Sequence, residues 1–344
     1  MKTLNNRMQG TLHKVSGPLT RDVGQKCKRN PAMINRSIYR SILGVFIAGL
    51  VILCIGHEAR GQEAFKAMIK TVGFVTVEKQ VYEKVSEEGS DKILEVWYRD
   101  PINNQQRPKT QTASGTYFSL SWHGAGYIVT AKHVILDGAG KPADSGVFHL
   151  NDHDGKRKSL TFDFMEDHAG SRWFLHETAD VAVHPLWRPV ELVTGLESIA
   201  VENTSTNIPQ MPQILDSAYA IGFPLAMGVG ESLSPIAKEC KIASLTQNIM
   251  GRADNGLPVS GRFILLDQAL AQGYSGAPIY VCPTPNSLSL LGLMSSVNTD
   301  ATGGKISLVV PMDYVIEVLK SPQFKSYEKL HGLGESQISA GDGT

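Results

Sequence analysis

The feature that most constrains the fold is a succession of short apolar runs between residues 72 and 311, separated by turn-forming residues. Runs of this length, rich in β-branched and aromatic residues and bounded by Gly, Pro, Asn or Asp, predict β-strands. The abundance of glycine, with 33 residues, suits a chain of short strands and many turns. Only Met312–Lys320 has a convincing helical pattern, so we expect an all-β fold with a C-terminal helix.

The predicted strands fall into two sets. The first set, to Val183, comprises Val72–Val77, Ile93–Tyr98, Thr116–Ser121, Tyr127–Thr130, Val147–Leu150, Ser159–Phe164 and Val181–Val183. The second set comprises Ala218–Gly222, Cys240–Leu245, Phe263–Leu266, Ala277–Val281, Leu290–Val297 and Ile306–Pro311.

The sets are separated by Thr204–Pro212, a polar stretch with two prolines that predicts a linker. We therefore expect two antiparallel six-stranded β-barrels, residues 62–203 and 204–320, the second closed by the helix. The polar run Asn103–Thr112 is expected to be a loop, and 321–344 a flexible tail without a PDZ-sized segment.

The first 61 residues are expected to be a leader. Residues 41–55 form a 15-residue run without charge, preceded by Arg36 and Arg40. This run is short for a spanning helix and suits a signal peptide, with cleavage before Gln62. The alternative is an uncleaved anchor that attaches the chain to the inner membrane. Either way we predict that the rest of the chain is exported, as a periplasmic or secreted protein.

The composition and the cysteine content exclude few classes of function. The chain is 42% hydrophobic with a net charge of 0, which gives no reason to expect nucleic acid as a partner. Beyond the leader, the two cysteines are Cys240 and Cys282. An oxidising compartment permits a disulfide between them, but we favour two separately buried thiols.

The stretch Gln272-Gly273-Tyr274-Ser275-Gly276-Ala277-Pro278 predicts a sharp turn that exposes a serine. Glycine at position 273 lets its N–H approach a substrate carbonyl. The N–H groups of Gly273 and Ser275 could then form an oxyanion hole. Since Gly, Ser and Pro also fill ordinary loops, the turn alone does not decide between a nucleophile and a plain turn.

Two other local patterns supply partners for the serine. Thr130-Ala131-Lys132-His133 ends an apolar run, and Asp180 opens the run Val181–Val183. Asp180 follows His133 by 47 residues and Ser275 follows Asp180 by 95. The order and the spacing match the His-Asp-Ser triad of chymotrypsin, with separations of about 45 and about 93.

On these residues the chain resembles the trypsin-like serine peptidases of the chymotrypsin fold, of the bacterial HtrA type, over roughly residues 66–320. The resemblance is carried by Ser114–Phe118, Ile128–Val134, Asp180–Val183, Ala220–Pro224, the Ser275 turn and Val310–Val315. It implies chymotrypsin-like barrels and a serine endopeptidase acting on protein or peptide substrates. The chain departs from the family at Ala277, where glycine is usual, and at Tyr274, where Asp or Asn is common.

In this interpretation Ser275 attacks the peptide carbonyl, His133 is the general base and Asp180 orients the imidazole. A lone histidine at a strand end is more often structural, and an aspartate there is often a turn residue. The common spacing favours catalysis for both. Asp163, Asp167 and Asp216 are weaker candidates for the carboxylate, because none precedes an Asp-Val-Ala-Val pattern.

The resemblance places the primary substrate pocket on the runs before and after the serine. We expect it to be lined by Ala269, Leu270, Met294, Ser295 and Ser296. With Ala269 six residues before the serine, no buried carboxylate awaits a substrate Lys or Arg. We therefore expect a small or medium apolar residue on the acyl side of the cleaved bond, unless Asp267 points inward.

No metal site or cofactor is predicted. Asn151–Gly155 resembles part of a calcium loop but lacks the later acidic ligand, so a hairpin turn is favoured. Two other function classes remain as alternatives: a catalytically inactive trypsin-like domain used as a binding or scaffold module, and an α/β-hydrolase esterase. The esterase is disfavoured because Ala277 occupies the last glycine of its motif and no histidine partner is expected after the serine. The natural substrate and the oligomeric state do not follow from the sequence.

Overall fold

A computed structural model describes residues 65–87, 90–162, 173–186, 195–201, 212–252, 258–284, 287–299 and 302–331. The predicted leader, with its apolar run at 41–55, lies outside these residues. So do residues 204–211 of the predicted linker and residues 332–344 of the predicted tail. Within the described residues, no helix combines the length and the apolar character that a membrane-spanning helix requires.

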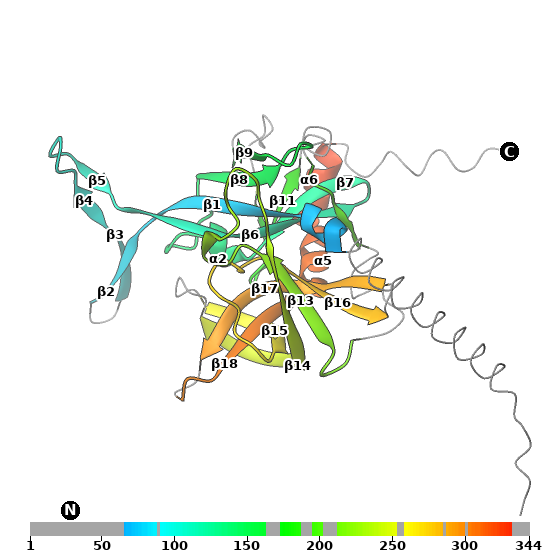
Figure 1. Ribbon diagram of the computed structural model, residues 1–344. Helices are drawn as coiled ribbons and strands as arrows, with labels where there is room; N and C mark the ends of the chain where they lie inside the picture. The colour runs from blue at the N-terminus through cyan, green and yellow to red at the C-terminus, as the bar shows by residue number, and fades with distance from the viewer. Residues whose placement is uncertain are drawn as a thin grey trace, which may run out of the picture. The chain divides into compact units, whose positions relative to one another are not determined.

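The structure is built mainly of β-strands (Figure 1), which confirms the all-β class. The first half contains β1 (Val72–Gln80), β2 (Tyr82–Glu87), β3 (Ser90–Glu95), β4 (Trp97–Arg99), β5 (Gln106–Pro108), β6 (Thr110–Trp122), β7 (Ala125–Thr130), α2 (Lys132–Ile135), β8 (Ser145–Asn151), β9 (Arg157–Thr161), β10 (Phe174–Leu175), β11 (Ala182–Leu186) and β12 (Ile199–Ala200).

The second half contains β13 (Ser217–Gly222), η3 (Pro224–Ala226), β14 (Ile236–Arg252), β15 (Pro258–Leu266), β16 (Pro278–Thr284), β17 (Ser287–Thr299), β18 (Lys305–Pro311), α5 (Met312–Lys320) and α6 (Pro322–Leu330). All six predicted strands of the second set are present. The predicted boundary between the halves falls among residues 202–211, outside the described residues.

The N-terminal sheet has the strand order β10-β11-β7-β6-β1-β8-β9, and β12 pairs with β6 in parallel. It differs from the expected closed six-stranded barrel: it has eight strands, including the two-residue strands β10 and β12, and its end strands β10 and β9 do not pair with each other in the described residues. Within it, β6 and β7 form the predicted hairpin. Their turn, His123-Gly124, has φ angles of 49° and 80°, as a two-residue hairpin turn requires.

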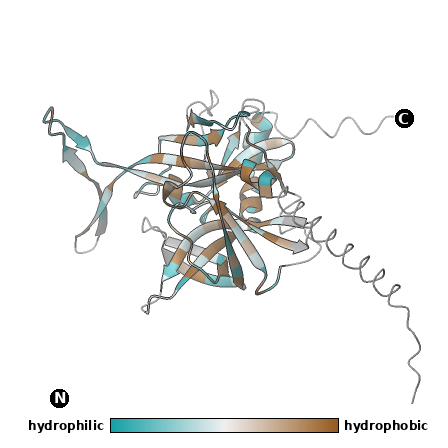
Figure 2. Cartoon of the chain, viewed as in Figure 1, coloured by the Kyte–Doolittle hydropathy of each residue, from teal (hydrophilic) through white to brown (hydrophobic). Residues whose placement is uncertain are grey.

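The C-terminal sheet follows the order β13-β14-β15-β18-β17-β16 and closes on itself, because β13 pairs with both β14 and β16. Every pairing in it is antiparallel, as expected from its short runs and turns. Hydrophobic residues, brown in Figure 2, lie mainly in the strands of the two large sheets. The larger buried cluster joins both halves, for example through Phe74 and Phe223, whose ring centroids lie 5.6 Å apart.

The segment between β1 and β6 corrects the sequence prediction. Residues 103–112, expected to be a loop, contain β5 and the start of β6. Strands β2–β3 and β4–β5 form two narrow ribbons, which continue from β1 and return into β6 (Figure 1). Polar residues form strands here because β6 pairs with β1 as far as Gln80 opposite Thr110, so backbone pairing, not apolar burial, sets the strand ends.

The C-terminal end also differs from the prediction. Helix α5 has the predicted bounds, but Pro322–Leu330 forms a second helix where a flexible tail was expected. The Ser321 hydroxyl caps this helix by accepting a hydrogen bond from the N–H of Phe324 (3.2 Å). Phe324 is fully buried, so the helix is held by its apolar side.

In the part of the chain that the structure describes, Cys240 and Cys282 are free thiols, Cys240 buried and Cys282 exposed, so the expected burial is wrong for Cys282. Strand register explains this. Cys240 lies opposite Ala218, which lies opposite Val281, so these three side chains share one face. Cys282 comes next and points to the other face.

Candidate active site

His133 lies in the one-turn helix α2, directly after β7. Strand β7 is buried along Tyr127–Thr130, and Ala131 keeps an extended backbone (φ −71°, ψ 134°) before the turn begins. His133 thus lies just beyond the C-terminal end of the buried strand β7. The His133 side chain remains mostly buried, with 8% of the residue exposed.

Asp180 binds His133 through both carboxylate oxygens. The ring Nδ1 of His133 lies 2.7 Å from Oδ2, and the backbone N–H of His133 donates to Oδ1 at 2.8 Å. Because a carboxylate only accepts, Nδ1 carries a hydrogen and Nε2 of the neutral ring is left as the acceptor. This is the tautomer that a general base requires.

The environment of Asp180 keeps its carboxyl ionised. The residue is 1% exposed, and the Ser295 hydroxyl donates to Oδ2 at 2.6 Å. Burial alone would raise the pKa of this carboxyl, but the charge of His133 and the hydrogen bonds from His133 and Ser295 outweigh it. Together they lower the pKa of Asp180 to about 2.

The loop before β11 holds Asp180 in place through His176. Its Nδ1 accepts hydrogen bonds from the N–H groups of Thr178 (3.2 Å) and Ala179 (2.9 Å). Its Nε2 lies 2.9 Å from a carboxylate oxygen of Glu317 on α5. Its carbonyl accepts from the Lys132 ammonium at 2.9 Å, so the loop is tied to the helix that carries His133.

Ser275 lies in the predicted turn between β15 and β16. Gly273 and Gly276 take positive φ angles of 100° and 81°, which glycine adopts without strain. A side chain at position 276 would also lie 2.2 Å from the Thr116 carbonyl and 2.9 Å from the Ala131 nitrogen. The turn therefore packs directly on the strands that lead to His133.

The backbone of Ser275 is fixed beside the His133 helix. Its carbonyl accepts from the N–H of Thr116 (2.8 Å). A Cβ added to Gly115 would lie 2.9 Å from that carbonyl and 2.7 Å from Val134, the neighbour of His133. The Ser275 carbonyl and the helix that carries His133 thus both pack against Gly115 of β6.

The turn presents two N–H groups in the manner expected for an oxyanion hole. The Gln272 carbonyl accepts from the N–H of Leu225 (2.7 Å), and the Tyr274 carbonyl accepts from the N–H of Ala277 (2.7 Å). Because N–H and C=O point in opposite directions across a trans peptide, the N–H groups of Gly273 and Ser275 face away from these partners. Neither donates a hydrogen bond to the described part of the chain.

The two departures from the family pattern are accommodated. Ala277 is absent from the residues with positive φ, so its methyl group causes no backbone strain. Tyr274 is 3% exposed, and its hydroxyl donates to the Ile236 carbonyl at 3.1 Å. Tyr274, the residue before Ser275, thus holds the serine turn against β14.

The residues predicted to line the substrate pocket divide into two groups. Ala269 is exposed and Ser296 is partly exposed, whereas Leu270 and Met294 are buried. Ser295 is fully buried with its hydroxyl on Asp180, which corrects its assignment to the pocket: its side chain supports the carboxylate instead. Asp267 does not point into the pocket, since it is exposed and accepts from the N–H of Lys241 (2.8 Å).

Three residues around the site make contacts that the sequence did not predict. They are Ser295 on Asp180, Thr116 on the nucleophile turn, and Lys79, whose ammonium donates to the His133 carbonyl. Thr116 and Ser295 lie within segments already singled out, but only their orientation reveals the role. Lys79 gives no signal in the sequence beyond a lysine at the end of an apolar strand.

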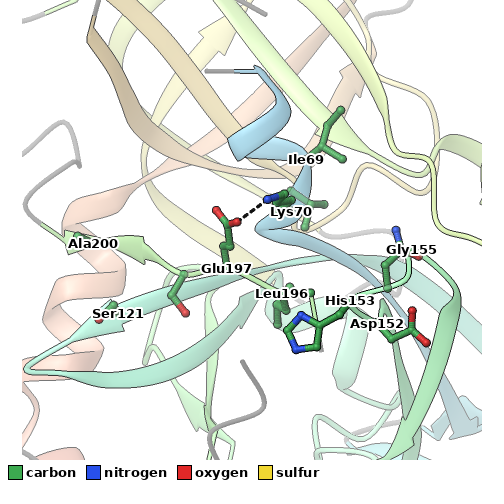
Figure 3. Close-up of a pocket in the computed structure, with 13 residues that line it drawn as sticks. Ile69, Lys70, Ser121, Asp152, His153, Gly155, Leu196, Glu197 and Ala200 are labelled. Carbon is green, nitrogen blue, oxygen red and sulfur yellow. Dashed lines mark hydrogen bonds and ion pairs between the residues drawn. The ribbon is translucent and has the colours of Figure 1, made fainter. Parts of the chain in front are cut away.

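A separate cavity of about 710 Å³ opens on the N-terminal half (Figure 3). It is lined by residues preceding β1, by the 151–155 turn and by residues 195–200, and Lys70 and Glu197 form an ion pair there (2.8 Å). The turn itself is the predicted hairpin turn: Asp152 Oδ1 accepts from the N–H groups of Asp154 and Lys156. None of the candidate catalytic residues lines this cavity.

No family model and no curated protein matches the chain. Solved structures similar to it include the HtrA-type protease AlgW with a decapeptide, at a TM-score of 0.43 and 22% identity over 75% of this chain and 66% of AlgW. The MamO protease domain from Magnetospirillum magneticum gives a TM-score of 0.44 at 11% identity, over 75% of this chain and 100% of MamO. The active form of the Rv3671c protease from M. tuberculosis gives 0.43 at 14% identity, over 74% of this chain and 82% of Rv3671c.

The chain thus spans about two thirds of the length of AlgW. All three structures are of proteases, and AlgW is of the HtrA type that the sequence resembles. With TM-scores below 0.5, these likenesses carry no argument about the reaction.

Proposed function

We propose that the chain is an exported serine endopeptidase that cleaves protein or peptide substrates through an acyl-enzyme on Ser275. The observation that carries this proposal is the buried His133–Asp180 pair, supported by Ser295, together with a glycine-flanked serine turn packed beside the strands that lead to His133. Each group has one role in acyl transfer.

The first step joins the Ser275 oxygen to the carbonyl carbon of the substrate, while Nε2 of His133 accepts the hydroxyl proton. The N–H groups of Gly273 and Ser275 stabilise the oxyanion that forms. The ionised Asp180 stabilises the imidazolium, which then returns the proton to the leaving amine. In the second step water takes the place of the amine. It gives a proton to Nε2 of His133 and attacks the acyl carbon, and the bond from that carbon to the Ser275 oxygen then breaks as Ser275 regains its proton. This scheme needs no metal or cofactor.

A fluorophosphonate probe tests the proposal, because it phosphonylates only an activated serine. We expect the full chain to be labelled, and labelling to be lost in Ser275→Ala and in His133→Ala. Ser234→Ala, which changes an exposed serine in the same half, is the matched control and should label like the wild type. For kcat with a peptide substrate we expect losses of about 10⁴-fold or more in the two active-site variants.

An inactive binding module is the second candidate, which Tyr274 and Ala277, the two departures from the family pattern in the serine turn, keep open. A folded wild-type chain that resists the probe at every pH from 6 to 9 would support it and reject the peptidase. Export is tested separately, by sequencing the N-terminus of the protein recovered from the periplasm. A first residue of Gln62 would establish cleavage of the leader.

A further inference from the structure

Lys79 is the last but one residue of β1, and its side chain reaches the helix that carries His133. Its ammonium donates a hydrogen bond to the main-chain carbonyl of His133. The residue is partly buried and pairs with Gln111 of β6 through its backbone. The Lys79 side chain thus connects β1 to the peptide group of His133, the candidate general base.

The surroundings of Lys79 are charged and mostly buried. Burial lowers the pKa of the ammonium to about 8, although Asp137 and then Asp180 act to raise it. Asp137 is 7% exposed and accepts the N–H groups of Ala139 and Lys141 (both 2.9 Å), while the hydroxyl of Tyr82 also bonds with it. The ammonium therefore carries its charge at neutral pH, among two carboxylates and the histidine.

A second cation that interacts electrostatically with Asp180 is Lys132. Its ammonium donates to the carbonyl of His176 and not to that of His133. The charged groups near the His–Asp pair thus include Asp137, Lys79 and Lys132, and Tyr82 bonds with Asp137.

We propose that Lys79 is a positioning residue for His133, which fixes the peptide group of the histidine and keeps its imidazole neutral before the reaction. The physical reason is the buried Asp180. A carboxylate in contact with an imidazole favours the protonated ring, and a protonated ring cannot accept the serine proton. A nearby ammonium opposes that effect and leaves the base free at a lower pH.

This inference rests on the proposed function for its catalytic meaning, but its test does not require activity. In the full chain carrying Ser275→Ala, the titration of the His133 ring is followed by NMR of nitrogen-labelled histidine. Three further variants are compared in that background: Lys79→Met, Lys79→Gln and Lys79→Arg. The first two remove the charge, Gln keeps a polar N–H, and Arg keeps the charge.

We expect the titration midpoint of His133 to rise by about half a pH unit or more in the Met and Gln variants. The Arg variant should stay within the error of the parent. In the active chain, Lys79→Met should lower kcat/KM several-fold more at pH 6 than at pH 8, whereas a merely structural role would lower it equally at both.

Equal midpoints in all four proteins overturn the proposal, and so does failure of both neutral variants to fold when Lys79→Arg folds, since the role is then structural. The two proposals fail separately. If the fluorophosphonate probe does not label the wild-type chain but the His133 titration midpoint still shifts in the Lys79 variants, the peptidase proposal is rejected and the Lys79 proposal is kept. If the probe labels the wild-type chain and the midpoint does not shift, the peptidase proposal is kept and the Lys79 proposal is rejected.

Discussion

His184 on β11 is a buried histidine whose surroundings contrast with those of His133. It is 1% exposed, its Nδ1–H donates to the Pro185 carbonyl at 2.8 Å, and its ring packs on Trp173 with centroids 5.0 Å apart. Burial lowers the pKa of this imidazole to about 4. The hydrogen bond to the Pro185 carbonyl acts to raise this pKa, but burial outweighs it, so the side chain serves the core as a neutral ring.

This predicts a specific loss of stability in mild acid. An unfolded histidine has a pKa of about 6.5, so between pH 6.5 and 4 the unfolded state binds more protons than the folded state. The free energy of unfolding should fall through that window by on the order of 2–3 kcal/mol. His184→Phe should remove this part of the fall, as measured by urea unfolding at pH 7.0 and pH 4.5.

His153→Asn, which changes an exposed histidine of the 151–155 turn, is the control and should behave like the wild type. Asp180 does not interfere, because its stabilising effect is complete above its unfolded pKa of 3.8 and is lost only as the pH falls toward about 2. An equal fall in the wild type and in His184→Phe would contradict the prediction.

At the residue scale, the sequence singles out His133, Asp180 and Ser275 as candidate catalytic residues by order and spacing, and the structure pairs the first two. It could not predict Ser295 on Asp180 or Lys79 on His133. Both contacts depend on which way a side chain points from a strand, and strand register decides that. One residue of slippage in β17 would turn Ser295 to the other face of the sheet.

Among the elements, the strand runs and α5 followed from apolar patterning, while α6 did not. Its sequence, PQFKSYEKL, has few apolar residues, and the polar segment beyond it favoured a tail. The helix is held instead by tertiary contacts. Phe324 packs on Tyr127 and Phe174 at 5.2 and 4.9 Å between centroids, and Glu328 accepts from the Tyr127 hydroxyl at 3.0 Å.

We expect Ser321→Ala to lower the free energy of unfolding by about 1 kcal/mol, because it removes the helix cap. Phe324→Ala should cost about 3–5 kcal/mol, since it leaves a cavity against two aromatic rings. Ser326→Ala makes the same change as the cap variant at an exposed position of α6 and should cost little. Chemical denaturation of the full chain measures all three, and equal values for Ser321→Ala and Ser326→Ala would exclude the cap.

Across the whole molecule, two buried threonines connect the N-terminal sheet to the C-terminal sheet. The Thr116 hydroxyl donates to the Gly273 carbonyl at 2.8 Å and accepts from the N–H of Phe223 at 3.2 Å. The Thr71 hydroxyl, just before β1, lies 3.1 Å from the Tyr280 hydroxyl on β16. Only Thr116 touches the turn that holds Ser275.

The two threonines therefore give a matched pair of variants. Thr116→Val keeps the shape but leaves two buried backbone groups without partners, so we expect a cost of about 2–4 kcal/mol. It should also slow labelling by the fluorophosphonate about tenfold or more, because the Gly273 peptide loses its anchor. Thr71→Val should lower stability while leaving the labelling rate unchanged; slowing in both variants would point to a general loosening of the two halves.

The hydrogen bond between Asp180, in the loop before β11, and Ser295 on β17 links positions 115 residues apart in the two halves of the molecule. A chain that leaves a ribosome or a translocation pore N-terminus first has its base and carboxylate long before the serine and its support exist. The proposed enzyme can thus hydrolyse peptide bonds only after its second half has been synthesised and has docked on the first. A nascent chain that lacks the second half could therefore not cleave other chains, and we expect a cut between the halves that allowed them to separate to abolish activity.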